Sequence, residues 1–379
     1  MAPTVLSQDV LNRTLLARQG LLTPFSGAFA ETVEAVGAIQ AQYWPAVAVS
    51  LFTRNSTATL EGVYDAFERR ELVVGSSIRG TVHAVSRAEH PLYAAVSEAT
   101  DADIVASRNE GKDPGMRELR AAVLEFAAEK PRSAAEFLTF AQEWAAKHPG
   151  RMSAANLEYH ESRNWRPIYR SNALIRFPAD GRWSAATGPK TYMYQPERAA
   201  DTDTATATLV RRHLGAFGPA AVDDVATWLG LKVSVARAVV EGFEDLVTYT
   251  DEAGRTLYDL PEGEVVHAGA DVAAPPRLLP RFDSILLAHN AKHRQRIISR
   301  EYWDRVYNGK NLQILPSFLV GGYVAGIWSV EVKKKLATLT LEPFHKLGKA
   351  EGKALMAEAE RVLRLQAPES GAYAVEVAG

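Results

Sequence analysis

The chain has no cysteine among its 379 residues, which excludes a disulfide framework, thiolate catalysis and cysteine-ligated zinc. It also has no run of about 18 uncharged apolar residues, so no transmembrane helix is expected. The first twenty residues, "MAPTVLSQDVLNRTLLARQG", lack the unbroken apolar core of a signal peptide. These absences predict a cytoplasmic protein, associated with the nucleoid if it binds DNA.

Charge of one sign is not in excess either. The formal net charge is -2, so composition gives no indication of a polyanionic partner, although a local basic face remains compatible with that value. No phosphate-binding glycine-rich loop, no HExxH motif and no metal-ligand spacing of histidines is present. We therefore expect no metal and no organic cofactor.

A pattern of helices followed by a β-hairpin occurs three times, which predicts tandem winged helices. In the first copy, helices over residues 7–23, 30–40 and 60–70 precede "LVVGSSIRGTVHAVS" (72–86). In the second, helices over 116–130 and from Ser133, which forms a capping box with Glu136, precede a strand–turn–strand. The third copy, 206–259, has a turn at Gly230 and a hairpin around "DEAG".

The sequence pattern changes from helical to alternating polarity after the proline-rich stretch "VAAPPRLLPRFD". Residues 312–342 alternate in polarity and turn at Gly321-Gly322, as antiparallel strands do, and "KAEGKALMAEAERVLRLQ" closes the chain with a helix. The fold class is therefore α+β, with tandem winged-helix motifs and a C-terminal β-rich module. The expected divisions are 1–112, 113–200, 201–268 and 269–379.

Two stretches are candidates for DNA contact. The segment "HNAKHRQRIISR" (289–300) has four cations and no acid, which suits either phosphate contact or a solvated loop. In "SIRGTVHAV", alternate residues share one face if the segment is a strand, and that face either reaches a site or meets solvent. The residues expected to bind DNA are Arg79, Thr81, His83, Lys292, His293, Arg294 and Arg296.

The stretch "IQAQYWP" places Gln40 and Gln42 beside an aromatic pair at the expected end of an apolar helix, just before Pro45. On an ideal helix, residues two apart point about 200° from one another. Both amides can face one site only if the helix unwinds there. The alternative is that these amides cap the loose carbonyls of a helix end.

Four stretches resemble the winged-helix DNA glycosylases of the AlkZ/YcaQ type. They are "LNRTLLARQGLL", "GAIQAQYWPAVAVSLFTR", "SIRGTVHAVS", and "RFDSILLAHNAKHRQRII" with "ILPSFLVGGYVAGIW". The resemblance implies a C-shaped monomer and a monofunctional glycosylase for bulky alkylated purines. One branch of the family unhooks interstrand crosslinks joined through guanine N7, and the other has Gln-x-Asp where this chain has Gln-x-Gln. In the family this pair is catalytic, which implies the same for Gln40 and Gln42.

The expected function is hydrolysis of the N-glycosidic bond of N7-alkylated guanine, in antibiotic self-resistance or repair, on double-stranded alkylated or crosslinked DNA. Such a guanine is already cationic, so its bond to the sugar is weakened and positioned amides can replace a strong base. The rival hypotheses are a winged-helix DNA-binding regulator without catalysis and a protein-interaction scaffold.

Overall fold

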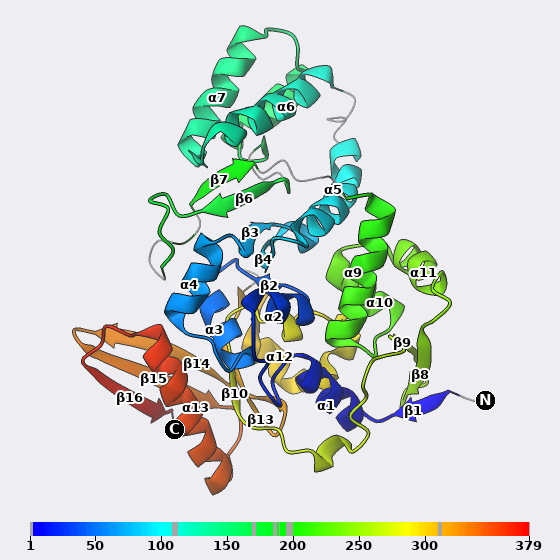
Figure 1. Cartoon of the computed structure of the whole chain (residues 1–379), viewed down its shortest axis with the longest axis vertical. Helices are drawn as coiled ribbons and strands as arrows, with labels where there is room; N and C mark the ends of the chain where they lie inside the picture. Colours follow the sequence, from blue (N-terminus) through cyan, green and yellow to red (C-terminus); the bar gives the residue numbers. More distant parts are fainter. Residues whose placement is uncertain are drawn as a thin grey trace. The chain divides into compact units, whose positions relative to one another are not determined.

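The computed structural model describes residues 3–107, 113–168, 172–184, 188, 190–194, 200–309 and 313–378 (Figure 1). The chain forms two compact units. Unit 1 comprises Met1–Val63 and Val210–Gly379, and unit 2 comprises Tyr64–Leu209. Both contain helices and sheets, so the α+β class is confirmed. None of the helices in the described ranges is long and apolar enough to span a membrane.

Unit 1 begins with a strand that pairs far along the chain. Strand β1 lies parallel to β8, with Val5 opposite Thr250, and β8 forms the expected hairpin with β9. The elements of this part are β1 (Thr4–Leu6), α1 (Gln8–Arg18), α2 (Phe29–Ala35), β2 (Ile39–Gln40), α3 (Pro45–Arg54), α9 (Thr202–Phe217), α10 (Val222–Leu229), α11 (Val233–Glu241), β8 (Val247–Asp251) and β9 (Thr256–Asp259). Helix α9 starts in unit 2 and ends in unit 1.

The helices of this part start and stop where their caps predict. The side chain of Ser7 accepts a hydrogen bond from the backbone N–H of Val10 at the start of α1. Gly230 ends α10 with a φ of 74°, a left-handed conformation that glycine adopts without a steric penalty. The sequence α9–α10–α11–β8–β9 is therefore the expected order of helices and hairpin.

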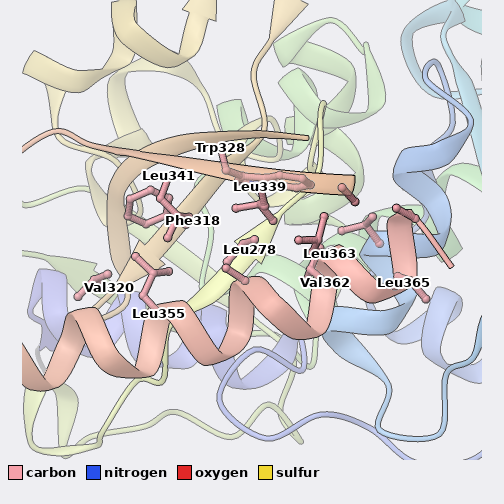
Figure 2. Close-up of a cluster of buried hydrophobic side chains, with 14 of the residues drawn as sticks. Leu278, Phe318, Val320, Trp328, Leu339, Leu341, Leu355, Val362, Leu363 and Leu365 are labelled. Atoms are coloured by element: carbon pink, nitrogen blue, oxygen red, sulfur yellow. The ribbon is translucent and has the colours of Figure 1, made fainter. Parts of the chain in front are cut away.

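The C-terminal part of unit 1 is a five-stranded sheet in the order β10-β13-β14-β15-β16, and β13, β14 and β15 pair antiparallel as expected. Buried residues of helix α13, including Leu355 and Val362, pack on Phe318 and Leu339 of the sheet (Figure 2). The remaining elements are β10 (Arg277–Leu279), the 3-10 helix η6 (Ala291–Arg296), α12 (Arg300–Val306), β11 (Tyr307–Asn308), β12 (Gln313–Ile314), β13 (Ser317–Val320), β14 (Tyr323–Lys333), β15 (Leu336–Pro343), α13 (Lys349–Gln366) and β16 (Ala372–Val377).

Unit 2 has its own core, in which Met116, Phe137 and Trp165 are buried together. The capping box at α7 is confirmed, because Ser133 and Glu136 exchange hydrogen bonds between side chain and backbone. Its strands follow the order β4-β3-β6-β7-β5. The elements are α4 (Leu60–Glu68), which begins in unit 1, β3 (Leu72–Ser76), η1 (Ile78–Gly80), β4 (Val82–Ser86), α5 (His90–Ser107), α6 (Pro114–Glu129), β5 (Arg132–Ser133), α7 (Ala134–Lys147), α8 (Ala154–Glu161), β6 (Leu174–Phe177) and β7 (Thr191–Tyr194).

Candidate active site around Gln40 and Gln42

The backbone around the two glutamines is not the helix that the sequence predicts. Helix α2 ends at Ala35, Gly37 and Ala38 have φ values of 76° and 83°, and Gln40 ends the short strand β2. Pro45 does not end a helix but opens α3 at its first turn, where its missing N–H costs nothing. The expectation of a helix through Gln40 is therefore wrong, because two residues in the left-handed region turn the chain before it.

Close packing explains the first of these turns. A Cβ at Gly37 would lie 3.0 Å from Cε2 of Phe217 and 3.2 Å from Cβ of Ala216, so only glycine fits there without displacing a neighbour. The backbone after Ala38 also changes the geometry of the pair. Strand β2 ends at Gln40, and Gln42 lies in the bend that follows, so the 200° separation expected on a helix does not apply.

The two amides differ in burial. Gln40 is 7% exposed, and its Oε1 accepts no hydrogen bond from the part of the chain that the structure describes. Gln42 is exposed, and Ala41 between them is buried. A buried acceptor without a donor costs about 1–3 kcal/mol, and such groups in folded proteins call for an explanation. The amide oxygen of Gln40 can therefore accept a hydrogen bond from a water molecule or a substrate group.

A segment of "RFDS" (281–284) supports the glutamine segment from a distant part of the sequence. Oγ of Ser284 donates a hydrogen bond of 3.1 Å to the carbonyl oxygen of Ala38. Phe282 has a φ of 58°, which is strained for an aromatic residue and is the kind of backbone found at functional sites. Sequence reasoning missed this segment as part of the site, because positive φ at Ala38 and Phe282 has no signal in the residue types.

Two charged residues of the same segment have defined partners. The guanidinium of Arg281 lies 5.6 Å from the ring centroid of Tyr43, next to Gln42, and its Nη1 donates to Oε1 of Gln313. Oδ1 of Asp283 accepts a 2.7 Å bond from Nη2 of Arg54, and both side chains are buried. The exposed side of the candidate site therefore has an arginine on an aromatic ring, and its buried side has an ion pair.

The three residues expected on one strand face do not form one. Arg79, with a φ of 58°, and Thr81 lie in or beside the turn η1 between β3 and β4, and only His83 is in a strand. His83 is buried, and burial, with a smaller effect of Arg79, lowers its pKa to about 3. A neutral, enclosed imidazole is unsuited to phosphate contact. Arg79 and Thr81, which are partly exposed, stay candidates for DNA contact within unit 2.

The basic stretch is also divided by burial. It folds as the 3-10 helix η6, in which Lys292 is exposed and Arg294 is half-buried. His293 and Arg296 are buried, and Arg296 donates a hydrogen bond of 2.9 Å to the carbonyl oxygen of Pro219. The structure removes these two residues from the expected DNA contacts, because both side chains are buried and each makes a hydrogen bond to another part of the protein.

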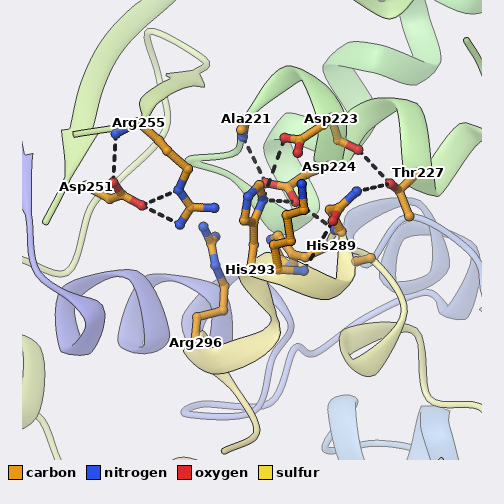
Figure 3. A network of polar contacts seen from close by, with 12 residues as sticks. Ala221, Asp223, Asp224, Thr227, Asp251, Arg255, His289, His293 and Arg296 are labelled. Carbon is orange, nitrogen blue, oxygen red and sulfur yellow. Dashed lines mark hydrogen bonds and ion pairs between the residues drawn. The ribbon is translucent and has the colours of Figure 1, made fainter. Parts of the chain in front are cut away.

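Asp224 is the centre of the network that fixes η6 (Figure 3). Its carboxylate accepts hydrogen bonds from the backbone N–H groups of Ala221 and Asn290, and lies 2.6 Å from Nδ1 of His293. Asp223, Asp224 and His293 offer atoms within 4.8 Å of one another, a spacing compatible with a metal ion. The Asp224 oxygens are already engaged by three groups, so the arrangement is best explained as a structural network.

Comparison with known proteins agrees with this architecture. The structure of the Streptomyces sahachiroi DNA glycosylase AlkZ superposes with a TM-score of 0.77, covering 99% of this chain and 100% of that one at 21% identity. At that identity the likeness establishes the fold. In sequence, the interstrand DNA cross-link repair glycosylase of Streptomyces sahachiroi is 29% identical over 171 residues, which are 43% of each protein. The aligned region is thus less than half of that relative's length.

The sequence profile of one family covers most of the chain. The profile described as "DNA glycosylase AlkZ-like" matches residues 33–365, a range that contains the glutamine pair, the "RFDS" segment and η6. The chain therefore belongs to the AlkZ-like family of DNA glycosylases.

Proposed function

We propose that this protein is a monofunctional DNA glycosylase that hydrolyses the bond between C1′ and N9 of N7-alkylated guanine, including bulky adducts or interstrand crosslinks. Membership of the AlkZ-like family supports the reaction class. The observation that carries the site is the buried Oε1 of Gln40, an acceptor for which no described residue supplies a donor, two residues from the exposed Gln42. The proposal also includes a fold of tandem winged helices and a monomeric enzyme.

The chemistry fits two uncharged amides. N7-alkylated guanine carries a positive charge, so the bond electrons pass to the base when C1′–N9 breaks, and the base leaves neutral without protonation. Water adds to C1′ and its proton goes to solvent. In this mechanism Oε1 of Gln40 orients that water and stabilises positive charge at C1′, and Gln42 contacts the sugar or the water from the exposed side. Unmodified purines, whose departure needs protonation, are expected to be poor substrates.

A cleavage assay tests the proposal. A duplex with one N7-methylguanine is incubated with wild type, Gln40→Ala, Gln42→Ala or the matched control Gln142→Ala, which changes an exposed glutamine of α7. Abasic sites are broken in alkali and resolved on a gel, with a lane without enzyme for spontaneous depurination. We expect activity of wild type and the control, and a loss of about 100-fold in the two site variants, the usual effect of removing a preorganised dipole.

The same assay on a crosslinked duplex then tests the substrate class. Cleavage of the crosslink supports the unhooking activity, and cleavage of the single adduct alone limits the enzyme to monoadducts. Duplex binding without cleavage of either substrate would instead identify a DNA-binding protein whose glutamines have no role in hydrolysis. Gln42→Asp is expected to shift substrate choice, since a carboxylate can activate water for less reactive adducts. An unchanged spectrum would contradict the role given to Gln42.

A further inference from the structure

Two adjoining hollows in unit 1 flank the 3-10 helix η6 and α12, and they differ in chemistry. The larger, of about 530 Å³, is lined by Lys292, Arg294, Arg300 and Trp303, and Asp304 is the one acid among its described lining residues. The second, of about 380 Å³, shares Arg300 and Gln295 with the first, but the rest of its lining is aromatic, apolar or uncharged polar, apart from His345. The larger hollow therefore has three cations and one carboxylate, which favours an anionic ligand.

The cations of the larger hollow form no ion pair with a described residue, although the charge of Lys292 acts on Asp223 from beyond ion-pair distance. Among the residues that the structure describes, no carboxylate lies within ion-pair distance of Lys292, Arg294 or Arg300. Asp304 is four residues after Arg300 on α12, yet the two form no ion pair. Arg211, by contrast, forms such a pair with Asp245. An anion from outside the chain would complete this hollow.

The guanidinium of Arg294 is oriented by Trp303 in a way that suits binding of an anion. Its guanidinium carbon lies 4.2 Å from the ring centroid of Trp303, a stacking distance that fixes the plane of the fork and leaves its edge available. Its Nε is buried and donates no hydrogen bond within the described part of the chain. Burial also lowers the pKa of Arg294 from its ordinary value, as expected for a cation that has lost part of its hydration.

We propose that the hollow lined by Lys292, Arg294, Arg300 and Trp303 binds a backbone phosphate of the DNA substrate, at a site separate from the glutamine pair. Phosphate oxygens match the planar fork of arginine, which binds them with two parallel hydrogen bonds. Lys292 and Arg300, both exposed, add charge at the mouth of the hollow. The site acts by positioning the duplex, and it has no part in breaking the glycosidic bond. The inference rests on the proposed function, since it takes DNA as the ligand.

Binding of an unmodified, fluorescein-labelled duplex tests this site without requiring any cleavage. Anisotropy titrations at several salt concentrations give Kd and the slope of log Kd against log salt for wild type, Lys292→Gln and the double variant Arg294→Gln/Arg300→Gln. The matched control is Lys353→Gln, which removes one exposed cation from α13. We expect the double variant to bind roughly tenfold more weakly, with a slope smaller by about 0.9, the effect of losing one phosphate contact.

The control should keep the Kd and slope of wild type. Equal values for the double variant and the control would overturn the proposal. Lys292→Gln covers the case in which the double variant fails to fold, because Lys292 is exposed and its loss disturbs no packing. A smaller slope for this variant alone, with unchanged thermal unfolding, supports the site, and an unchanged slope counts against it.

Two further measurements separate the ligand sources and the roles. Calorimetric titration with inorganic phosphate asks whether the hollow takes a free anion. Phosphate binding that the double variant loses, together with unchanged DNA affinity, would assign the hollow to a free phosphate compound and overturn the DNA assignment.

Single-turnover cleavage of the N7-methylguanine duplex at saturating enzyme should proceed at the wild-type rate in the double variant. A rate as low as that of Gln40→Ala would place these arginines in the catalytic step instead. If wild type binds DNA with the expected salt dependence but cleaves nothing, the proposed function fails and the phosphate site stands.

Discussion

The buried ion pair between Arg54 and Asp283 offers the most direct test of how the glutamine segment is held. Nη2 of Arg54 lies 2.7 Å from Oδ1 of Asp283, and the two side chains are 1% and 0% exposed. In Asp283→Asn the shape of the side chain and an acceptor for the N–H of Ile285 are kept, but the charge is removed. The guanidinium of Arg54 is then buried without a counter-ion, which we expect to cost about 3–5 kcal/mol of stability.

An exposed pair of the same residue types provides the control. Nη2 of Arg211 lies 2.6 Å from Oδ2 of Asp245, with side chains 34% and 49% exposed. Asp245→Asn makes the same chemical change in the same unit, but water screens the remaining arginine, so we expect a loss of about 0–1 kcal/mol. The two variants therefore differ in burial while their bond lengths are nearly equal.

Hydrogen exchange measured by mass spectrometry gives the local free energy of opening for helix α3, which holds Arg54. Asp283→Asn should lower the protection of α3 and of residues 281–285, and should also reduce cleavage, because Ser284 next to it bonds the carbonyl of Ala38. The reasoning is refuted if Asp283→Asn changes the protection of α3 no more than Asp245→Asn does. Loss of protection with full cleavage activity would show that the pair stabilises the unit without positioning the site.

Gly326→Ala should destabilise unit 1 by about 1–3 kcal/mol, since its Cβ would collide with the ring of Phe318. Gly352→Ala in α13 meets open space and should stabilise unit 1 by about 0.5–1 kcal/mol. The urea concentrations at the unfolding midpoints of the two variants and wild type test both expectations. Because His83 has a pKa of about 3 when folded against 6.5 in its ordinary state, the unfolded chain binds one more proton as pH falls below 6.5. We therefore expect the free energy of unfolding of unit 2 to fall by about 1.4 kcal/mol per pH unit between pH 6 and 5. Hydrogen exchange of β4 measures this dependence, and His83→Gln should abolish it. Asp224→Ala should expose η6 to exchange and proteolysis, while wild-type protection there would contradict the network of Figure 3.

The regular elements could be predicted because their signals are local. The hairpin of β8 and β9, the αL glycine at the end of α10 and the capping box of α7 each depend on residues a few positions apart. The helix α3 was not expected, since Pro45 was interpreted as the end of the preceding helix. The same residue type is favoured at the first turn of a helix, and the sequence alone did not separate these two uses.

The functional residues were harder to assign because burial depends on partners far away in the sequence. Four cations in "HNAKHRQRIISR" look alike as a charge run. The structure divides the stretch into buried and accessible residues. Asp224, 69 residues away, fixes His293, and the carbonyl of Pro219, 77 residues away, accepts a hydrogen bond from Arg296. What remains for a ligand is Lys292, Arg294 and Arg300. Lys292 and Arg294 are among the predicted DNA contacts, Arg300 is an addition, and all three line one hollow.

The positions of Gln40 and Gln42 also depend on the local backbone, and this matters for the proposed mechanism. A helical segment would have pointed Gln40 and Gln42 apart, and unwinding would have been needed to bring both amides to one site. The turn at Gly37 and Ala38 instead places Gln40 at the end of the short strand β2 and Gln42 in the bend that follows, and the two amides differ in burial. A buried acceptor suits a fixed water, because its orientation is set before the substrate arrives, whereas an exposed amide can adjust to adducts of different size. In the proposed mechanism, this difference in burial gives the fixed positioning of water to Gln40 and the tolerance for different substrates to Gln42.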